Sequence, residues 1–127
     1  MAAQTVWHVY EGVVFINEQP ATGDWDVSFH GQKMIFDTGQ QRLQATVGLT
    51  SRNITIGSDT QPRQLVAQRN SASSWLIFRS SDDARLAHWE HGVFALVGDA
   101  EAEGDLADLL KAAAIVCWRM ENPIQAI

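Results

Sequence analysis

The 127-residue sequence has one cysteine, few basic residues and no long apolar run. The single cysteine, Cys117, cannot form an internal disulfide, and a lone thiol suits a reducing compartment. The longest apolar run, from Ala112 to Trp118, is too short to cross a bilayer. No lysine or arginine precedes Lys33, so the basic region of a secretory signal is missing. We therefore expect a cytoplasmic protein that does not enter a membrane.

Nine basic residues stand against fifteen acidic ones, and the formal net charge is −6. This balance argues against a nucleic-acid binder. Residues 1–32 carry four acids and no base, residues 33–79 carry six bases and two acids, and residues 80–127 carry nine acids and three bases. Such blocks fit either two solvated faces of opposite sign or a dipolar molecule that steers a partner.

Motifs of catalytic chemistry are missing as well. The sequence contains no G-x-S-x-G elbow, no P-loop and no C-x-x-C pair. Cys117 lies on the apolar stripe of a predicted helix, where a thiol usually packs as a small hydrophobic group. We expect no catalytic residue and no cofactor.

Two stretches contain side chains that can bind metal ions. In "HWEHG" (88–92) the odd spacing of His88 and His91 would point them to opposite faces of a strand. We interpret this stretch as a hairpin turn whose tip is Glu90-His91-Gly92. The stretch "DAEAEGD" (99–105) resembles the start of a calcium loop, but Leu110 stands where the bidentate carboxylate should be. We expect no metal at either place.

Period-2 alternation is what the first hundred residues do contain. The stretches "DWDVSFH" (24–30) and "RLQATVGLT" (42–50) alternate apolar and polar residues, which predicts antiparallel strands with one wet face. "SWLIF" (74–78) is apolar on both faces and predicts a central strand. "VWHVYEGVVFI" (6–16) reads as one long strand, with a bulge or bend at Gly12.

The pattern changes to a helical period near the C-terminus. From Asp105 the apolar residues recur every three or four positions, and Asn122 and Pro123 end the pattern. The residues of this stripe are Leu106, Leu109, Leu110, Ala113, Cys117 and Met120. We predict an α+β fold in one domain, residues 1–127. Seven to nine short, mostly antiparallel strands over 5–98 would form a twisted sheet or roll on one helix at about 104–121.

Five tryptophans are the clearest functional signal, because tryptophan is enriched in interface hot spots as well as in cores. Around the helix, Trp118 lies about 120° and Ile115 about 180° from Leu106. These two side chains beside Lys111 would face away from the sheet, so either the tail of the chain or a second chain must cover them. The leading hypothesis is a non-catalytic protein-binding module, such as an acidic regulator or an immunity-type inhibitor, that forms a homodimer through this surface.

Two other classes stay open. A small-ligand carrier would hold an apolar molecule within the sheet against Trp7, Trp25 and Trp75. An enzyme of unknown class would need a convergent polar cluster in a deep pocket.

Overall fold

The computed structural model describes residues 6–30, 33–48, 53–58, 63–71, 73–97 and 104–121, with the side chains of 104 and 105 left out. The strands are β1 (Val6–Tyr10), β2 (Val13–Ile16), β3 (Gln19–Pro20), β4 (Asp26–His30), β5 (Lys33–Asp37), β6 (Arg42–Val47), β7 (Ile54–Ser58), β8 (Gln64–Ser71), β9 (Ser74–Arg79), β10 (Arg85–Glu90) and β11 (Val93–Leu96). The helix is α1 (Gly104–Glu121).

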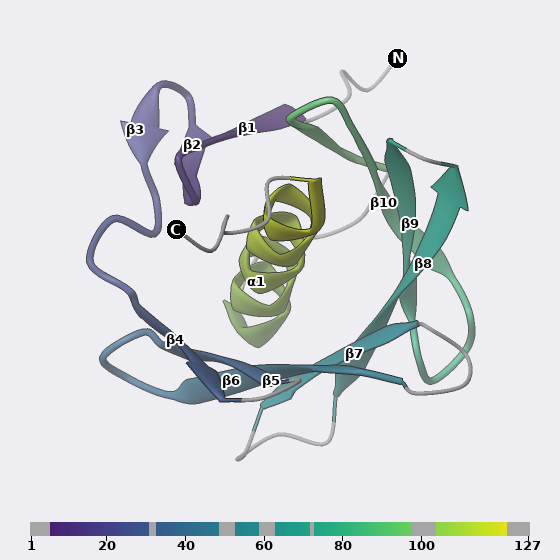
Figure 1. The fold of residues 1–127 in the computed structure, drawn as a ribbon, viewed down its shortest axis with the longest axis horizontal. Helices are drawn as coiled ribbons and strands as arrows, with labels where there is room; N and C mark the ends of the chain where they lie inside the picture. Colours follow the sequence, from purple (N-terminus) through teal and green to yellow (C-terminus); the bar gives the residue numbers. More distant parts are fainter. Residues whose placement is uncertain are drawn as a thin grey trace, which may run out of the picture.

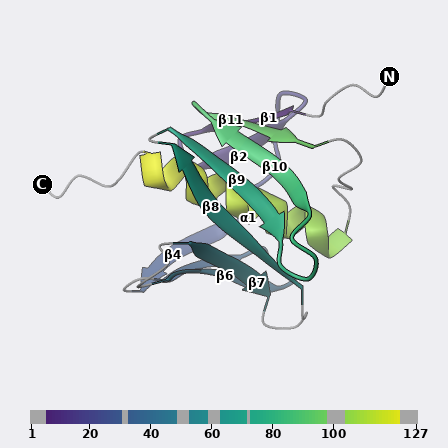
Figure 2. The same ribbon diagram turned by 90° about the vertical axis from the view of Figure 1, so that its right-hand side faces the viewer.

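All strands belong to one antiparallel sheet in the order β3-β2-β1-β11-β10-β9-β8-β7-β6-β5-β4. Neighbours in the sheet are neighbours in the chain, except that β1 pairs with β11. The sheet curls around α1, which lies at its centre (Figures 1 and 2). The ring of strands is open between the two edge strands, β3 and β4. The predicted α+β fold, an antiparallel sheet packed on one C-terminal helix, is confirmed.

The strand count is higher than the seven to nine expected, because the stretch 6–16 is not one bent strand. It forms β1 and β2, joined by Glu11 and Gly12 with φ angles of 52° and 80°. A two-residue hairpin turn of this hand requires positive φ at both positions, and glycine reaches it at no steric cost. The two-residue strand β3 is too short to give a periodic signal.

The predicted turn in "HWEHG" is confirmed. β10 ends at Glu90 and β11 begins at Val93, so His91 and Gly92 alone connect them. Their φ angles are 50° and 82°, the same combination as in the β1–β2 turn. The predicted central strand is also confirmed, since β9 is sixth of the eleven strands in the sheet order.

The helix has the predicted bounds, but its surroundings differ from the expectation. A helix on an open sheet has one wet face, whereas α1 is buried around its whole circumference in its middle turns. The buried residues are Leu106, Ala107, Leu109, Leu110, Ala112, Ala113, Ala114, Ile115, Val116 and Cys117. Met120, placed on the core stripe by the sequence pattern, is instead 39% exposed. The short side chains of the alanine run let strands approach the helix from several sides.

An aromatic row faces the helix across four neighbouring strands. It consists of Trp7 on β1, Phe94 on β11, Trp89 on β10 and Trp75 on β9, each paired with the next in the sheet register. The rings of Trp7 and Phe94 stack with centroids 5.7 Å apart. The indole nitrogens of Trp75 and Trp89 are buried without a hydrogen-bond partner. An unpartnered buried donor costs roughly 1–3 kcal/mol, so this row stabilises the fold through its ring contacts and not through the indole N–H groups. The guanidinium of Arg69 adds a cation–π contact, 5.4 Å from the ring centroid of Trp75.

The turn between β9 and β10 contains an exposed ion pair whose contribution to stability depends on pH. Arg79 donates from Nε and Nη2 to the two carboxylate oxygens of Asp82, at 2.9 and 2.8 Å. These hydrogen bonds, with a further one from the amide of Ala84, lower the pKa of Asp82 from 3.8 to about 2. Because the folded pKa is depressed, the contribution to stability is present above pH 3.8 and is lost as pH falls through 2.

We expect Arg79→Met to return the pKa of Asp82 toward 3.8, because the main donor is removed. A pH titration of the carboxyl carbon by NMR measures this directly. Arg85→Met, which removes an exposed arginine from the neighbouring strand, is the control and should leave the pKa of Asp82 unchanged. An unchanged value in Arg79→Met would contradict the assignment of the shift to this pair.

Candidate functional site

The outer face of β2, β1, β11 and β10 is apolar, and we refer to it as the β1 face. Its residues are the outward-pointing ones of these strands: Val6, His8, Tyr10, Val13, Phe15, His88, Glu90, Val93 and Ala95. The strand register aligns them in rows, because residues paired across strands share a face. His8 lies between Phe15 and Val93, while Tyr10 lies beside Val13.

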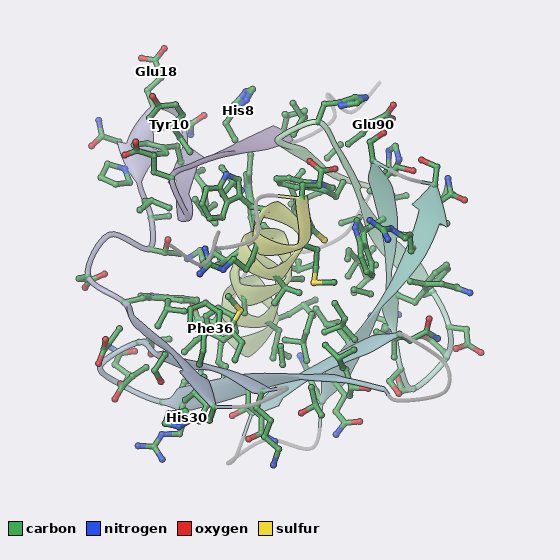
Figure 3. The ribbon with its side chains drawn as sticks, in the orientation of Figure 1. His8, Tyr10, Glu18, His30, Phe36 and Glu90 are labelled. Carbon is green, nitrogen blue, oxygen red and sulfur yellow. The ribbon has the colours of Figure 1, made fainter. Side chains whose placement is uncertain are left out.

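Two of the largest apolar exposures in the described part of the chain are on this face. Tyr10 is 69% exposed and Val6 is 39% exposed. Figure 3 shows His8 and Tyr10 projecting away from α1, whereas Phe36 on β5 points inward. Since apolar patches on protein surfaces often mark binding sites, the β1 face is the candidate site among the described residues.

The charged residues around the β1 face are mostly acidic, and the exception on its four strands is Arg85, exposed at the start of β10. Strands β1, β2, β3 and β11 contain no lysine or arginine. Glu11 and Glu18 occupy the turns at the ends of β2, and Glu90 ends β10, all three exposed (Figure 3 labels Glu18 and Glu90). The residues of the basic block lie on other strands, with Lys33 on β5, Arg42 on β6, Arg69 on β8 and Arg79 on β9. Since β5 and β6 lie across α1 from β1 and β2 (Figure 1), Lys33 and Arg42 are on the other side of the helix from the β1 face.

A histidine–glutamate group lies at one border of the β1 face. The carboxylate of Glu90 is 3.6 Å from Nε2 of His88 and 3.8 Å from Nε2 of His91. In the part of the chain that the structure describes, no group of three His, Cys, Asp or Glu side chains is arranged to hold a metal ion.

The calcium-like stretch 99–105 lies outside the described residues, except that α1 begins at Gly104. Leu110, at the position of the bidentate ligand, is fully buried in the core.

The expectation that Ile115 lies on an outer face of the helix is wrong. Ile115 is only 2% exposed, because the sheet curls around α1 and covers that side too. Lys111 lies beside Asp108, with Nζ 3.7 Å from the carboxylate, and its side chain is 20% exposed. Trp118 is half-buried and packs over Gly12 in the β1–β2 turn. The helical period gives the angle between residues but not how many sides the sheet covers.

The three tryptophans considered for a ligand carrier are not gathered at one place. Trp7 and Trp75 belong to the aromatic row and are 1% and 2% exposed. Trp25 precedes β4 and packs edge-on against Phe36, with ring centroids 6.2 Å apart. The space inside the sheet is occupied by α1 (Figure 1). The inward-facing side chains of the sheet therefore pack against residues of α1.

A shallow polar depression of about 300 Å³ lies on the outside of β6, β7 and β8. Its lining residues are Gln44, Thr46, Thr55, Gly57, Ser58 and Gln64. None of them has a side chain that titrates near neutral pH, so the depression supplies neither a general acid nor a general base.

Cys117 is fully buried on α1, and burial raises the pKa of its thiol well above the ordinary value, with the charge of Glu121 adding to the effect. A thiol that stays protonated is a poor nucleophile.

The β1 face was not singled out from the sequence. The signal was present in β1, where Val6, His8 and Tyr10 alternate with the buried Trp7 and Val9. Apolar or aromatic residues on both faces of a strand predict either that both faces are buried or that one is buried and the other is an exposed apolar surface.

Fold and site together define an antiparallel sheet curled around a C-terminal helix, with an apolar, acid-rimmed outer face. No family model matches the chain, and no curated protein or solved structure matches it. The helix of the described residues is neither long nor apolar enough to span a membrane.

Proposed function

We propose that this protein is a non-catalytic protein-binding module and that the β1 face is its binding surface. The observation that carries the proposal is the 69% exposure of Tyr10, the last residue of β1, beside Val13 on this largely apolar face. Tyrosine is among the residues that most often anchor an interface, and neighbours such as Val13 and Phe15 would exclude water around it.

The acidic rim indicates the chemistry of the partner. Glu11, Glu18 and Glu90 border the face, and of the strands β1, β2, β3, β11 and β10 only β10 contains a lysine or arginine, Arg85. A partner with an apolar centre surrounded by lysine or arginine would complement it, and opposite charges would speed the encounter. A small acidic regulator or immunity-type inhibitor fits this description. We propose a cytoplasmic location for it, supported by the single, buried cysteine.

A carrier of small apolar molecules has less support, because α1 occupies the interior and Trp25 lies away from Trp7 and Trp75. Saturable quenching of tryptophan fluorescence by such a molecule would favour that class instead.

A peptide-display selection on the wild-type protein tests the proposal. We expect the selected peptides to combine apolar residues with lysine or arginine. Tyr10→Ser should weaken their binding by about 2 kcal/mol or more, the loss typical of an interface anchor. Glu18→Lys should slow association, because the rim charge is reversed. Both are measured by surface plasmon resonance.

Two substitutions with the same side-chain exposure provide the control. Val6→Ser lies on the β1 face, and Met120→Ser lies on α1, and both wild-type side chains are 39% exposed. Only Val6→Ser should weaken peptide binding. Peptides selected without basic residues, or equal losses in Val6→Ser and Met120→Ser, would contradict the proposal.

A further inference from the structure

The two edge strands of the sheet differ in how they are protected. β3 has two residues, Gln19 and Pro20, and proline offers no N–H for pairing. β4 is five residues long, keeps an uninterrupted register with β5, and contains neither proline nor lysine. Among the described strands β4 pairs with β5 alone. Natural sheets protect their edges with proline, charged side chains, bulges or short strands. Of these β4 has only the charge of Asp26, so it is the edge more open to pairing.

The sequence of β4 is complementary to itself. When two copies run antiparallel with Ser28 opposite Ser28, Asp26 of each copy faces His30 of the other. In the same register, Val27 of each copy faces Phe29 of the other. The first pairing places the carboxylate of Asp26 beside the imidazole of His30 at the outer face, and the second joins apolar groups at the inner face, where Val27 and Phe29 lie.

We propose that two copies of this chain associate through β4, with the two strands paired antiparallel about Ser28. This surface is separate from the β1 face, so the inference goes beyond the proposed function. Phe29 is 49% exposed and lies under the guanidinium of Arg119, at 4.6 Å from ring centroid to Cζ. Pairing would bring its exposed part against the Val27 of the second copy.

The backbone allows this register. In antiparallel sheets the N–H and C=O groups of alternate residues point to the same edge. In β4, the residues whose N–H and C=O groups point to the open edge are either the even-numbered or the odd-numbered ones. Pairing about Ser28 places even-numbered residues opposite even-numbered ones and odd-numbered residues opposite odd-numbered ones, so hydrogen bonds can form in either case. Each chain has one edge open to pairing, so a two-fold pairing uses both edges and the assembly closes as a dimer.

Charge substitutions on β4 test the proposal by sedimentation velocity over a range of concentrations. We expect the wild-type protein to form a dimer. His30→Asp places two acids opposite each other twice, and Asp26→Lys removes both attractive pairs. Each substitution alone should raise the dimer dissociation constant roughly tenfold, since two cross-strand pairs change.

An equimolar mixture of the two variants should restore the dimer, because the introduced lysine then faces the introduced aspartate while Asp26 faces His30. Asp24→Lys, which makes the same charge change outside β4, should leave the dissociation constant unchanged. Thermal unfolding of each variant checks that it is folded, and the mixture reports on pairing even if one variant is less stable. A monomeric wild-type protein, a dimer insensitive to both substitutions, or a mixture no tighter than its components would overturn the proposal.

Discussion

Trp89→Ala should lower the free energy of unfolding by about 3–5 kcal/mol, the range for removing a large buried aromatic side chain. Trp89 is fully buried at the middle of the aromatic row, between Phe94 and Trp75. Its removal leaves a cavity against the helix that rigid strands on both sides cannot fill. Urea denaturation followed by circular dichroism measures the loss, because fluorescence would change with the tryptophan itself.

Trp89→Phe separates the packing of the ring from the indole nitrogen. Phenylalanine keeps most of the apolar contact and removes the donor that has no partner in the wild-type protein. Relief of that unpartnered group offsets part of the lost volume, so we expect a cost of about 1 kcal/mol. A cost as large as that of Trp89→Ala would show that the indole N–H stabilises the fold.

Ile115→Ala should cost about 2–5 kcal/mol of stability, because Ile115 is enclosed by the sheet and only 2% exposed. Met120→Ala, five residues further along α1 and 39% exposed, should cost about 0.5 kcal/mol or less. Both losses are obtained from urea unfolding, with sedimentation of the same samples. A stable Ile115→Ala variant that loses self-association would contradict the enclosed helix and favour an interface on α1.

Together these predictions distinguish two arrangements of the same secondary structure. In a helix packed on an open sheet, Ile115 would be a surface residue and Trp89 would have one packed side. In the curled sheet, both are core residues, and association must use the outside or the edge of the sheet.

The local elements could be predicted from the sequence because their signals are local. The bounds of α1 follow from a three- and four-residue period and from Asn122 and Pro123 after it. The turn at His91 and Gly92 follows from strand patterns on both sides of a glycine. The break between β1 and β2 could not be predicted, because the turn residue Glu11 adopts a positive φ, which glutamate rarely does.

The curling of the sheet was decided only by the tertiary structure. β1 pairs with β11, from the opposite end of the strand region, and this pairing turns a meander into a ring around α1. Periodicity shows that Ile115 is on another side of the helix from Leu106, but a second packed side depends on strands distant in sequence.

The same holds for the surfaces. The sequence by itself determined the element types, the acidic and basic blocks, and the apolar residues at alternate positions of β1. Only the folded chain gathered Tyr10 with Val13, Phe15 and Val93 into one face, and only it placed β4 at the edge of the described sheet, paired with β5. The physical reason is that alternation within a strand fixes which residues share a face, whereas pairing between distant strands fixes what lies beside them.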